Sequence, residues 1–238
     1  MRDHSATPRV DDVCVSHPLH LSSAIVAIMM VSIMAAAPAR ALESYPNERD
    51  EVRDQQAQIW AERGKGAFAA ADYPLAVTAY SELARLKPHD ARVFYNRGLA
   101  RRKAGDGNGA LEDFNEALAL NPNLSEALVN RARLYMSRNR TDDARTDLNS
   151  AEKLRPRDAA IPFMRGTLYA QSGELDGAIA DFSRALQLDS SHAGSFTERG
   201  LVYLKLGQAG LAKKDFESAL TLNPNDVGAR RELGVLDE

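Results

Sequence analysis

Few side chains in this sequence are of a type that could catalyse a reaction or bind a metal. The only cysteine is Cys14. It precedes an apolar segment, so a chain processed after that segment would have no thiol for catalysis, disulfides or metal binding. Beyond residue 41 the histidines are His89 and His192, which lie far apart in the sequence. Neither fits a metal-ligand spacing or a Ser-His-Asp arrangement. We interpret both as solvent-exposed turn residues.

Residues 105–109, Gly-Asp-Gly-Asn-Gly, have a composition that could cradle a phosphate or bind calcium. A calcium loop needs glycine at its sixth position and a carboxylate at its twelfth. Gly109 is only the fourth residue counted from Asp106. We interpret the segment as a turn between two helices. The sequence therefore predicts no cofactor, no metal site and no catalytic residue.

Arginine and aspartate recur at a fixed spacing. Arginine appears every 34 residues, and aspartate follows the last four arginines by 16 residues: Arg63, Arg97, Arg131, Arg165 and Arg199; Asp113, Asp147, Asp181 and Asp215. One interpretation is an arginine row that grips acidic ligands. The favoured one is structural, an Arg–Asp pair that joins two helices, because a half-buried arginine needs a carboxylate partner. Ala79 replaces the first aspartate, so Arg63 needs a different partner.

The elements that position these side chains form an internal repeat. From Ala57 the chain matches itself every 34 residues, in blocks 57–90, 91–124, 125–158, 159–192 and 193–226. Position 20 of every block is alanine, and position 8 is Gly64, Gly98, Ala132, Gly166 or Gly200. Such small residues let two antiparallel helices approach closely. Position 24 supplies bulk for the core, as Tyr80, Phe114, Leu148, Phe182 or Phe216.

Trp60, Gly64, Ala76, Tyr80 and Pro88 make the first block resemble the tetratricopeptide repeat family, which has the same period and landmarks. The resemblance covers residues 57–226, with local departures at Arg101, Pro162 and Ser190. It implies an all-α fold, a right-handed superhelical solenoid of antiparallel helix pairs that bury their apolar faces against one another. We expect ten helices and no strand in these residues.

Two further helices are expected at the ends of the repeats. Residues 42–56 should form a charged lead-in helix, with Asn47 as its N-cap. Residues 227–238 start a sixth block at the same register and stop after one helix. We expect them to form a C-terminal capping helix and tail.

The resemblance also indicates where a partner would bind. In this family the first helices of the repeats line a concave face and contact the ligand. The corresponding side chains here are Lys65, Arg92, Tyr95, Leu99, Arg102, Arg133, Met136, Phe163, Leu201 and Leu204. They change from basic in blocks one to three to apolar in blocks four and five. They favour a partner segment that is acidic at one end and apolar at the other. Alternatively, the arginines are solvated and pair with local carboxylates such as Glu126.

Residues 21–39 form the one long apolar run, followed by Ala41 in a small-x-small pattern that signal peptidases accept. The run is at the short limit for a membrane-spanning helix, which needs about 20 residues. We predict that residues 1–41 are a cleaved signal peptide, with a retained membrane anchor as the alternative. Both place the repeats outside the cytoplasm, in a bacterium in the periplasm.

The charge balance excludes some functions. Thirty Lys and Arg against 33 Asp and Glu give a net charge of −3, so the chain lacks the basic excess that nucleic-acid binding needs. We predict a non-catalytic interaction module, an extracytoplasmic adaptor or scaffold that binds a peptide segment of an envelope protein. The alternative is a membrane-anchored, self-assembling scaffold that uses its convex face. An enzyme is the least supported class.

Overall fold

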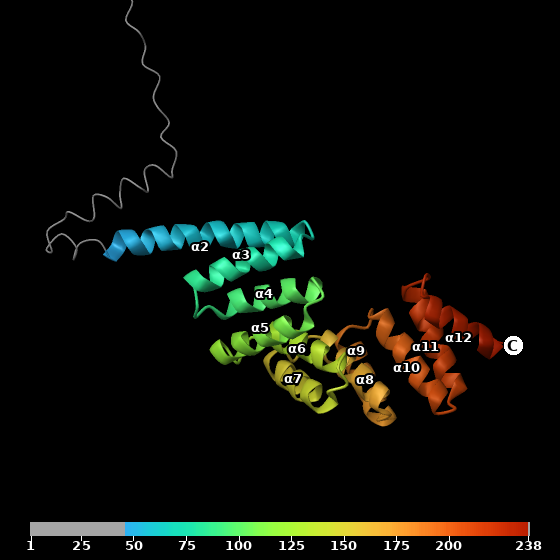
Figure 1. Ribbon diagram of the computed structural model, residues 1–238. Helices are drawn as coiled ribbons and strands as arrows, with labels where there is room; N and C mark the ends of the chain where they lie inside the picture. Colours follow the sequence, from blue (N-terminus) through green and yellow to red (C-terminus); the bar gives the residue numbers. More distant parts are fainter. Residues whose placement is uncertain (1–45, 238) are drawn as a thin grey trace, which may run out of the picture. The chain divides into compact units, whose positions relative to one another are not determined.

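The computed structural model describes residues 46–237, so the predicted signal peptide or anchor lies outside the described residues. Within this range the chain forms eleven α-helices and no strand, which confirms the predicted all-α fold. The helices follow one another as antiparallel pairs (Figure 1). Arg53–Glu238 form one compact unit, and the packing described below is that of this unit.

The first of the described helices, α2 (Pro46–Ala69), continues without interruption into the first helix of block one. It begins one residue before Asn47, so the prediction of Asn47 as N-cap is wrong. Proline is favoured at the first position of a helix because its fixed φ is helical and its missing N–H would have no partner there. The second helix of block one is α3 (Tyr73–Leu86).

Each later block contributes one helix pair at the predicted register. These pairs are α4 (Ala91–Lys103) with α5 (Gly107–Leu120), α6 (Ser125–Met136) with α7 (Thr141–Leu154), α8 (Ala160–Ser172) with α9 (Leu175–Leu188), and α10 (Ala193–Lys205) with α11 (Ala209–Leu222). Helix α12 (Val227–Asp237) follows the fifth pair and packs against α11. Ten helices, α2 to α11, thus contribute to residues 57–226, as the resemblance implies.

The turns inside the repeats have a common construction. Gly105, Gly173 and Gly207 lie between the two helices of their blocks with φ of +89°, +83° and +71°, a left-handed conformation that glycine adopts without steric cost. Asp106 then caps α5, because its Oδ1 accepts a hydrogen bond from the backbone N–H of Gly109 at 2.8 Å. Gly105 and Asp106 therefore form the predicted turn between helices, while residues 107–109 already belong to the first turn of α5.

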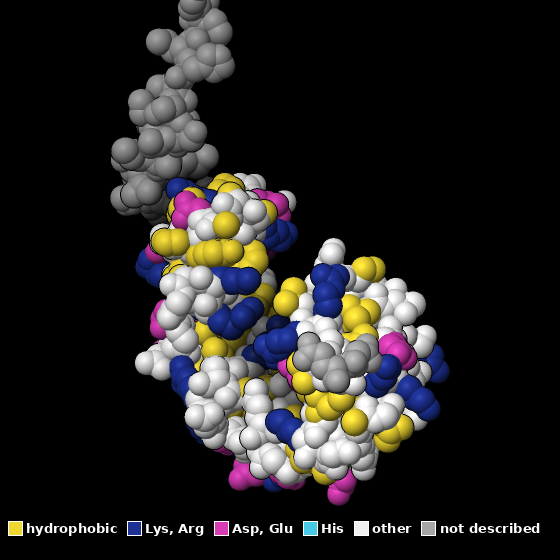
Figure 2. Space-filling model, turned by 90° about the vertical axis from the view of Figure 1, so that its right-hand side faces the viewer, with side chains coloured by type: hydrophobic (Ala, Val, Ile, Leu, Met, Phe, Trp, Pro, Cys, Tyr) yellow, Lys and Arg dark blue, Asp and Glu magenta, His cyan; other side chains and the backbone are white. Residues whose placement is uncertain are grey.

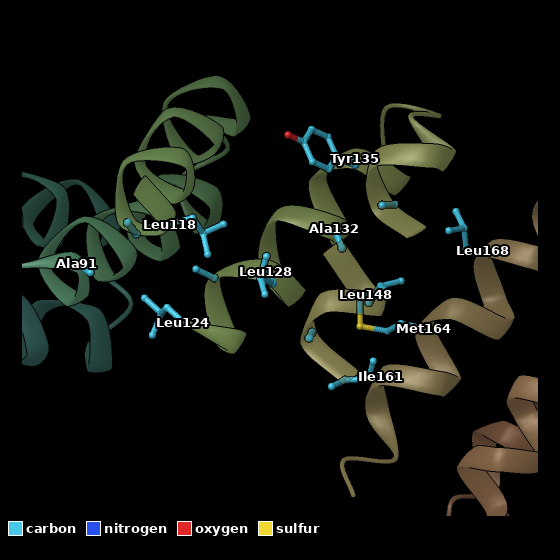
Figure 3. Packing of buried hydrophobic residues seen from close by; sticks show 14 residues of the cluster. Ala91, Leu118, Leu124, Leu128, Ala132, Tyr135, Leu148, Ile161, Met164 and Leu168 are labelled. Carbon is cyan, nitrogen blue, oxygen red and sulfur yellow. The ribbon is translucent and has the colours of Figure 1, made fainter. Parts of the chain in front are cut away.

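The close approach of paired helices depends on the match between positions 8 and 24. A Cβ added to Gly64, Gly98, Gly166 or Gly200 would lie 2.7–2.9 Å from the aromatic ring at position 24 of the same block. Block three instead combines Ala132 with the smaller Leu148, and both are fully buried. In Figure 3 these two side chains meet Met164 of the next block within one cluster. A larger residue at position 8 thus occurs with a smaller one at position 24.

This match predicts the outcome of a double-mutant cycle. Gly166→Ala should reduce the free energy of unfolding by about 1–3 kcal/mol, because the new Cβ overpacks the ring of Phe182. Adding Phe182→Leu reproduces the block-three combination and should recover part of the loss. The control is Gly210→Ala in α11, where an added Cβ meets no atom within 4 Å. Chemical denaturation would contradict this account if both alanine variants behaved alike.

Candidate protein-binding groove

The structure contains all four Arg–Asp pairs that the spacing predicts within single repeats. The shortest guanidinium–carboxylate distances are 2.6–2.8 Å, in Arg97–Asp113, Arg131–Asp147, Arg165–Asp181 and Arg199–Asp215. All four aspartates are buried. Each of these four arginines is neutralised by a carboxylate of its own repeat. The recurring arginines therefore join the two helices of a repeat, and none of the four leaves a free guanidinium group for an acidic ligand.

Three of these arginines also reach back to the preceding repeat. Arg131 and Arg165 donate to the side-chain oxygens of Asn115 and Asn149, both at 2.8 Å, and Arg199 donates to Ser183 Oγ at 2.9 Å. The acceptors share position 25 of their blocks. Sequence reasoning missed this contact, although the recurrence of short polar residues at position 25 is its signal. Each of these arginines therefore joins three helices.

Two local departures from the repeat pattern also find partners. Arg101, which replaces an aromatic residue, places its Nη1 3.1 Å from a carboxylate oxygen of Asp113. Asp113 consequently binds two arginines. In block one, where no aspartate is available, Arg63 lies over the ring of Trp60 at 5.3 Å from its centroid.

Three of the arginines predicted to line the groove differ from the arginines at position 7 of the repeats. Arg92, Arg102 and Arg133 form no ion pair with any carboxylate of residues 46–237, and Glu126 is no exception. Arg133 Nε donates only to the sulfur of Met164, at 3.4 Å. The Nε of Arg102 is buried without a hydrogen-bond partner. The pairing with Glu126 in the alternative is therefore absent among these residues, whereas Arg92 and Arg133 are exposed to solvent, as that alternative also expects.

All three charges act electrostatically on the hydroxyl of Tyr95. Burial raises the pKa of Tyr95, the nearby Glu126 carboxylate raises it further, and Arg102, Arg133 and Arg92 act in the opposite direction. The hydroxyl also accepts a hydrogen bond from Asn130 Nδ2 at 3.4 Å. The first helices of blocks two and three thus bring three unpaired guanidinium groups near one half-buried tyrosine.

The other groove candidates are less available. Lys65 forms an exposed ion pair with Glu62 at 2.8 Å, so its charge is partly compensated. The apolar candidates are all half-buried and pack against core clusters: Leu99, Met136, Phe163, Leu201 and Leu204. Figure 2 shows the hollowed face, where Lys and Arg side chains gather on one wall with hydrophobic side chains between them.

Comparison with known proteins agrees with the repeat pattern. Models of the tetratricopeptide repeat match residues 91–124, 129–193 and 193–226. The chain contains tetratricopeptide repeats. Repeats of this kind are generally non-catalytic modules that bind proteins or peptides, and the coarse function of this chain is accordingly that of a protein–protein interaction scaffold. No curated protein matches it in sequence.

Several solved tetratricopeptide repeat structures have the same fold. A MamA protein has a TM-score of 0.66 at 21% identity, over 72% of this chain and 93% of that one. YrrB, described as having an unusual peptide-binding site, has a TM-score of 0.64 at 19% identity, over 82% and 98%. A tetratricopeptide repeat protein from Parabacteroides merdae ATCC 43184 has 0.69 at 21%, over 76% and 72%. At these identities the likeness concerns the fold alone.

The two histidines of the tetratricopeptide repeats have different roles. His89 is exposed, as predicted. The prediction for His192 is wrong, because it is partly buried and caps α10: its Nδ1 accepts from the backbone N–H of Ser195 at 3.1 Å. Its ring also lies against Phe163, with centroids 4.6 Å apart. A single sequence cannot separate this role from an exposed turn, since capping depends on the side-chain rotamer.

The described residues contain no group of three or more His, Cys, Asp or Glu side chains that could hold a metal ion. Among residues 46–237, no helix is both long and apolar enough to cross a membrane.

Proposed function

We propose that this chain is an extracytoplasmic adaptor or scaffold whose groove binds an extended or helical segment of an envelope protein. The bound segment carries acidic residues toward blocks one to three and apolar residues toward blocks four and five. The observation that supports this most is the contrast between two sets of arginines. Four at position 7 are each paired with a buried aspartate, while Arg92, Arg102 and Arg133 have no carboxylate partner within residues 46–237.

Unpaired guanidinium groups near an apolar surface suit a carboxylate ligand. Arginine binds carboxylates with two parallel hydrogen bonds, and such charge-assisted bonds are stronger than neutral ones. Partial burial strengthens them further because the local dielectric constant is lower than that of water. Arg102 is only half-buried as a residue, so its guanidinium group can contribute to such a contact although its Nε is buried.

Apolar side chains at the far end of the groove supply the second part of the recognition. Leu201 and Leu204 lie on α10 and are only half-buried by the last core cluster. Phe163 of α8 is half-buried between Phe182 and His192. Covering such partly exposed carbon atoms with an apolar ligand stabilises the complex by roughly 25 cal/mol per Å².

A synthetic peptide tests this proposal directly. The probe peptide carries four glutamates at one end and leucine and phenylalanine at the other. Two versions are titrated, one with the glutamates at the N-terminus and one with them at the C-terminus, so that both orientations in the groove are tested. One of the two versions should bind, and its affinity should fall steeply with added salt. A peptide with lysine in place of glutamate is the control. Equal affinity for the glutamate and lysine peptides would refute an acidic ligand.

The extracytoplasmic location carries a prediction of its own. The processed chain should begin at Leu42, directly after the small-x-small pattern that signal peptidases accept. Mass spectrometry of the exported protein would show this N-terminus. Exported material with residues 1–41 intact would indicate the membrane anchor instead.

A further inference from the structure

One position of the repeats is buried everywhere except in block one. Position 3 of the later blocks packs in core clusters with residues of the preceding helix pair, as Val93 and Ala127 do. In the later blocks this residue is at most 4% exposed: Val93 4%, Ala127 0%, Ile161 1%, Ser195 0% and Ala229 0%. Ile59, the same position of block one, is 65% exposed. The face of α2 around Ile59 therefore leaves exposed a position that every later repeat buries.

The exposed residues of this face are spaced symmetrically about Ile59. They follow the spacing of three, four and seven residues that defines one helix face. The set is Val52, Gln55, Gln56, Ile59, Glu62, Arg63 and Gly66, and all seven are exposed. In an antiparallel pair of α2 helices centred on Ile59, a residue a given number of positions before Ile59 faces the residue the same number of positions after Ile59 in the second copy. Such a two-fold contact is the commonest way in which identical chains associate.

Each pair that this symmetry creates is complementary. Gln55 meets Arg63 of the second copy, and Gln56 meets Glu62 of the second copy, so no like charges face each other. Val52, which is 52% exposed, meets Gly66 of the second copy. A Cβ added to Gly66 would find no atom within 4 Å, so the glycine leaves room for the valine side chain. A knob opposite a small residue is typical of close helix packing.

The internal repeats show the contact that Arg63 would make. Arg63 occupies position 7, whose arginines in blocks three and four donate to an asparagine of the preceding helix at 2.8 Å. Arg63 has no carboxylate partner among the described residues and only rests on Trp60. The amide of Gln55 from a second copy offers the same acceptor chemistry as Asn115 and Asn149.

We infer that two copies of this chain associate through an antiparallel pair of α2 helices, with the two-fold axis at Ile59. The second copy covers the face that a preceding repeat covers in every later block. Arg92, Arg102 and Arg133 are on α4 and α6 and take no part in the contact. The dimer therefore presents two grooves, which would raise the apparent affinity for a partner with two binding segments.

Sedimentation of the full chain in a non-ionic detergent tests the association. The mass should double with rising concentration. Ile59→Glu should raise the dimer dissociation constant at least about 100-fold, because both copies lose an apolar contact and bury a carboxylate. Helicity should not change, since the side chain is exposed. Lys153→Glu, an exposed change on α7, is the control. A monomer at all concentrations, or a dimer that Ile59→Glu leaves intact, would overturn the inference.

Cross-linking tests the orientation independently of affinity. In a Cys14→Ser background, Ile59→Cys should be joined to itself by a short bis-maleimide reagent. Val52→Cys should react with Gly66→Cys in a mixture but not with itself, because the two Val52 positions lie about 21 Å apart in an antiparallel pair. Efficient self-reaction of Val52→Cys would show a parallel pair and contradict the proposed geometry.

Discussion

Asp147→Ala should lower the free energy of unfolding by about 3–5 kcal/mol, the range found when one partner of a buried ion pair is removed. Asp147 is buried, and its two oxygens accept from Arg131 Nε at 2.8 Å and Nη2 at 2.7 Å. Asp147 raises the pKa of Arg131, and a guanidinium group keeps its proton in a protein even without such a partner, so Arg131 stays charged in the variant. The variant therefore leaves an uncompensated charge between two helices. Urea denaturation followed by circular dichroism measures the loss.

Asp142→Ala is the matched control. Asp142 is on the same helix and pairs with Arg145 at 2.6 Å, but its side chain is 87% exposed. Exposed pairs contribute little because water and salt screen them, so this variant should unfold at nearly the wild-type urea concentration. Arg131→Met combined with Asp147→Leu should regain most of the stability, since apolar residues of similar volume often replace a buried pair well. If Asp147→Ala and Asp142→Ala lost the same free energy of unfolding, the proposed structural role of the position-7 arginines would be contradicted.

Arg92→Glu with Arg133→Glu should weaken binding of the acidic–apolar peptide at least about 100-fold, because attraction in the groove becomes repulsion. The remaining affinity should depend far less on salt, since the ion pairs that salt screens are gone. Both side chains are exposed, so helicity should hardly change. Fluorescence anisotropy of the labelled peptide measures both effects.

Arg157→Glu with Arg184→Glu is the control for net charge. Both arginines are exposed, the first in the turn before α8 and the second on α9, a second helix of its repeat. This pair changes the net charge by the same amount without touching the groove candidates. If it weakened the peptide as much as the groove variant does, long-range charge would explain the binding. Unchanged binding in the groove variant would move the site to the convex face.

The sequence was sufficient for the fold because every repeat encodes the same local contacts. Glycine at position 8 and an aromatic residue at position 24 recur at one spacing, and Arg97 precedes Asp113 by the same interval as Arg131 precedes Asp147. A contact whose residues recur at the repeat spacing can be predicted from a single sequence. The four Arg–Asp pairs were predictable for this reason.

What the sequence could not supply lies between repeats and at their ends. The contact of Arg131 with Asn115 depends on the angle at which adjacent helix pairs cross, and the repeat period alone does not determine that angle. The capping role of His192 depends on one rotamer. The exposure of Ile59 follows from its place in the first block, since no earlier repeat packs on this position as one does in the later blocks. The resemblance indicated the groove residues, but only the structure shows that Arg92, Arg102 and Arg133 have no carboxylate partner in the part of the chain that it describes.

Site-specific photo-cross-linking tests the groove proposal most directly. Glu126 lies close enough to Tyr95 to affect its pKa, and replacing it with benzoylphenylalanine puts a reactive group beside the three arginines. Arg184 on α9 is the comparison position. Applied to an envelope extract, the groove variant should capture a protein through a segment rich in Asp and Glu, and the α9 variant should not. Capture of the same segment from both positions, or of a segment without acidic residues, would contradict the proposed groove.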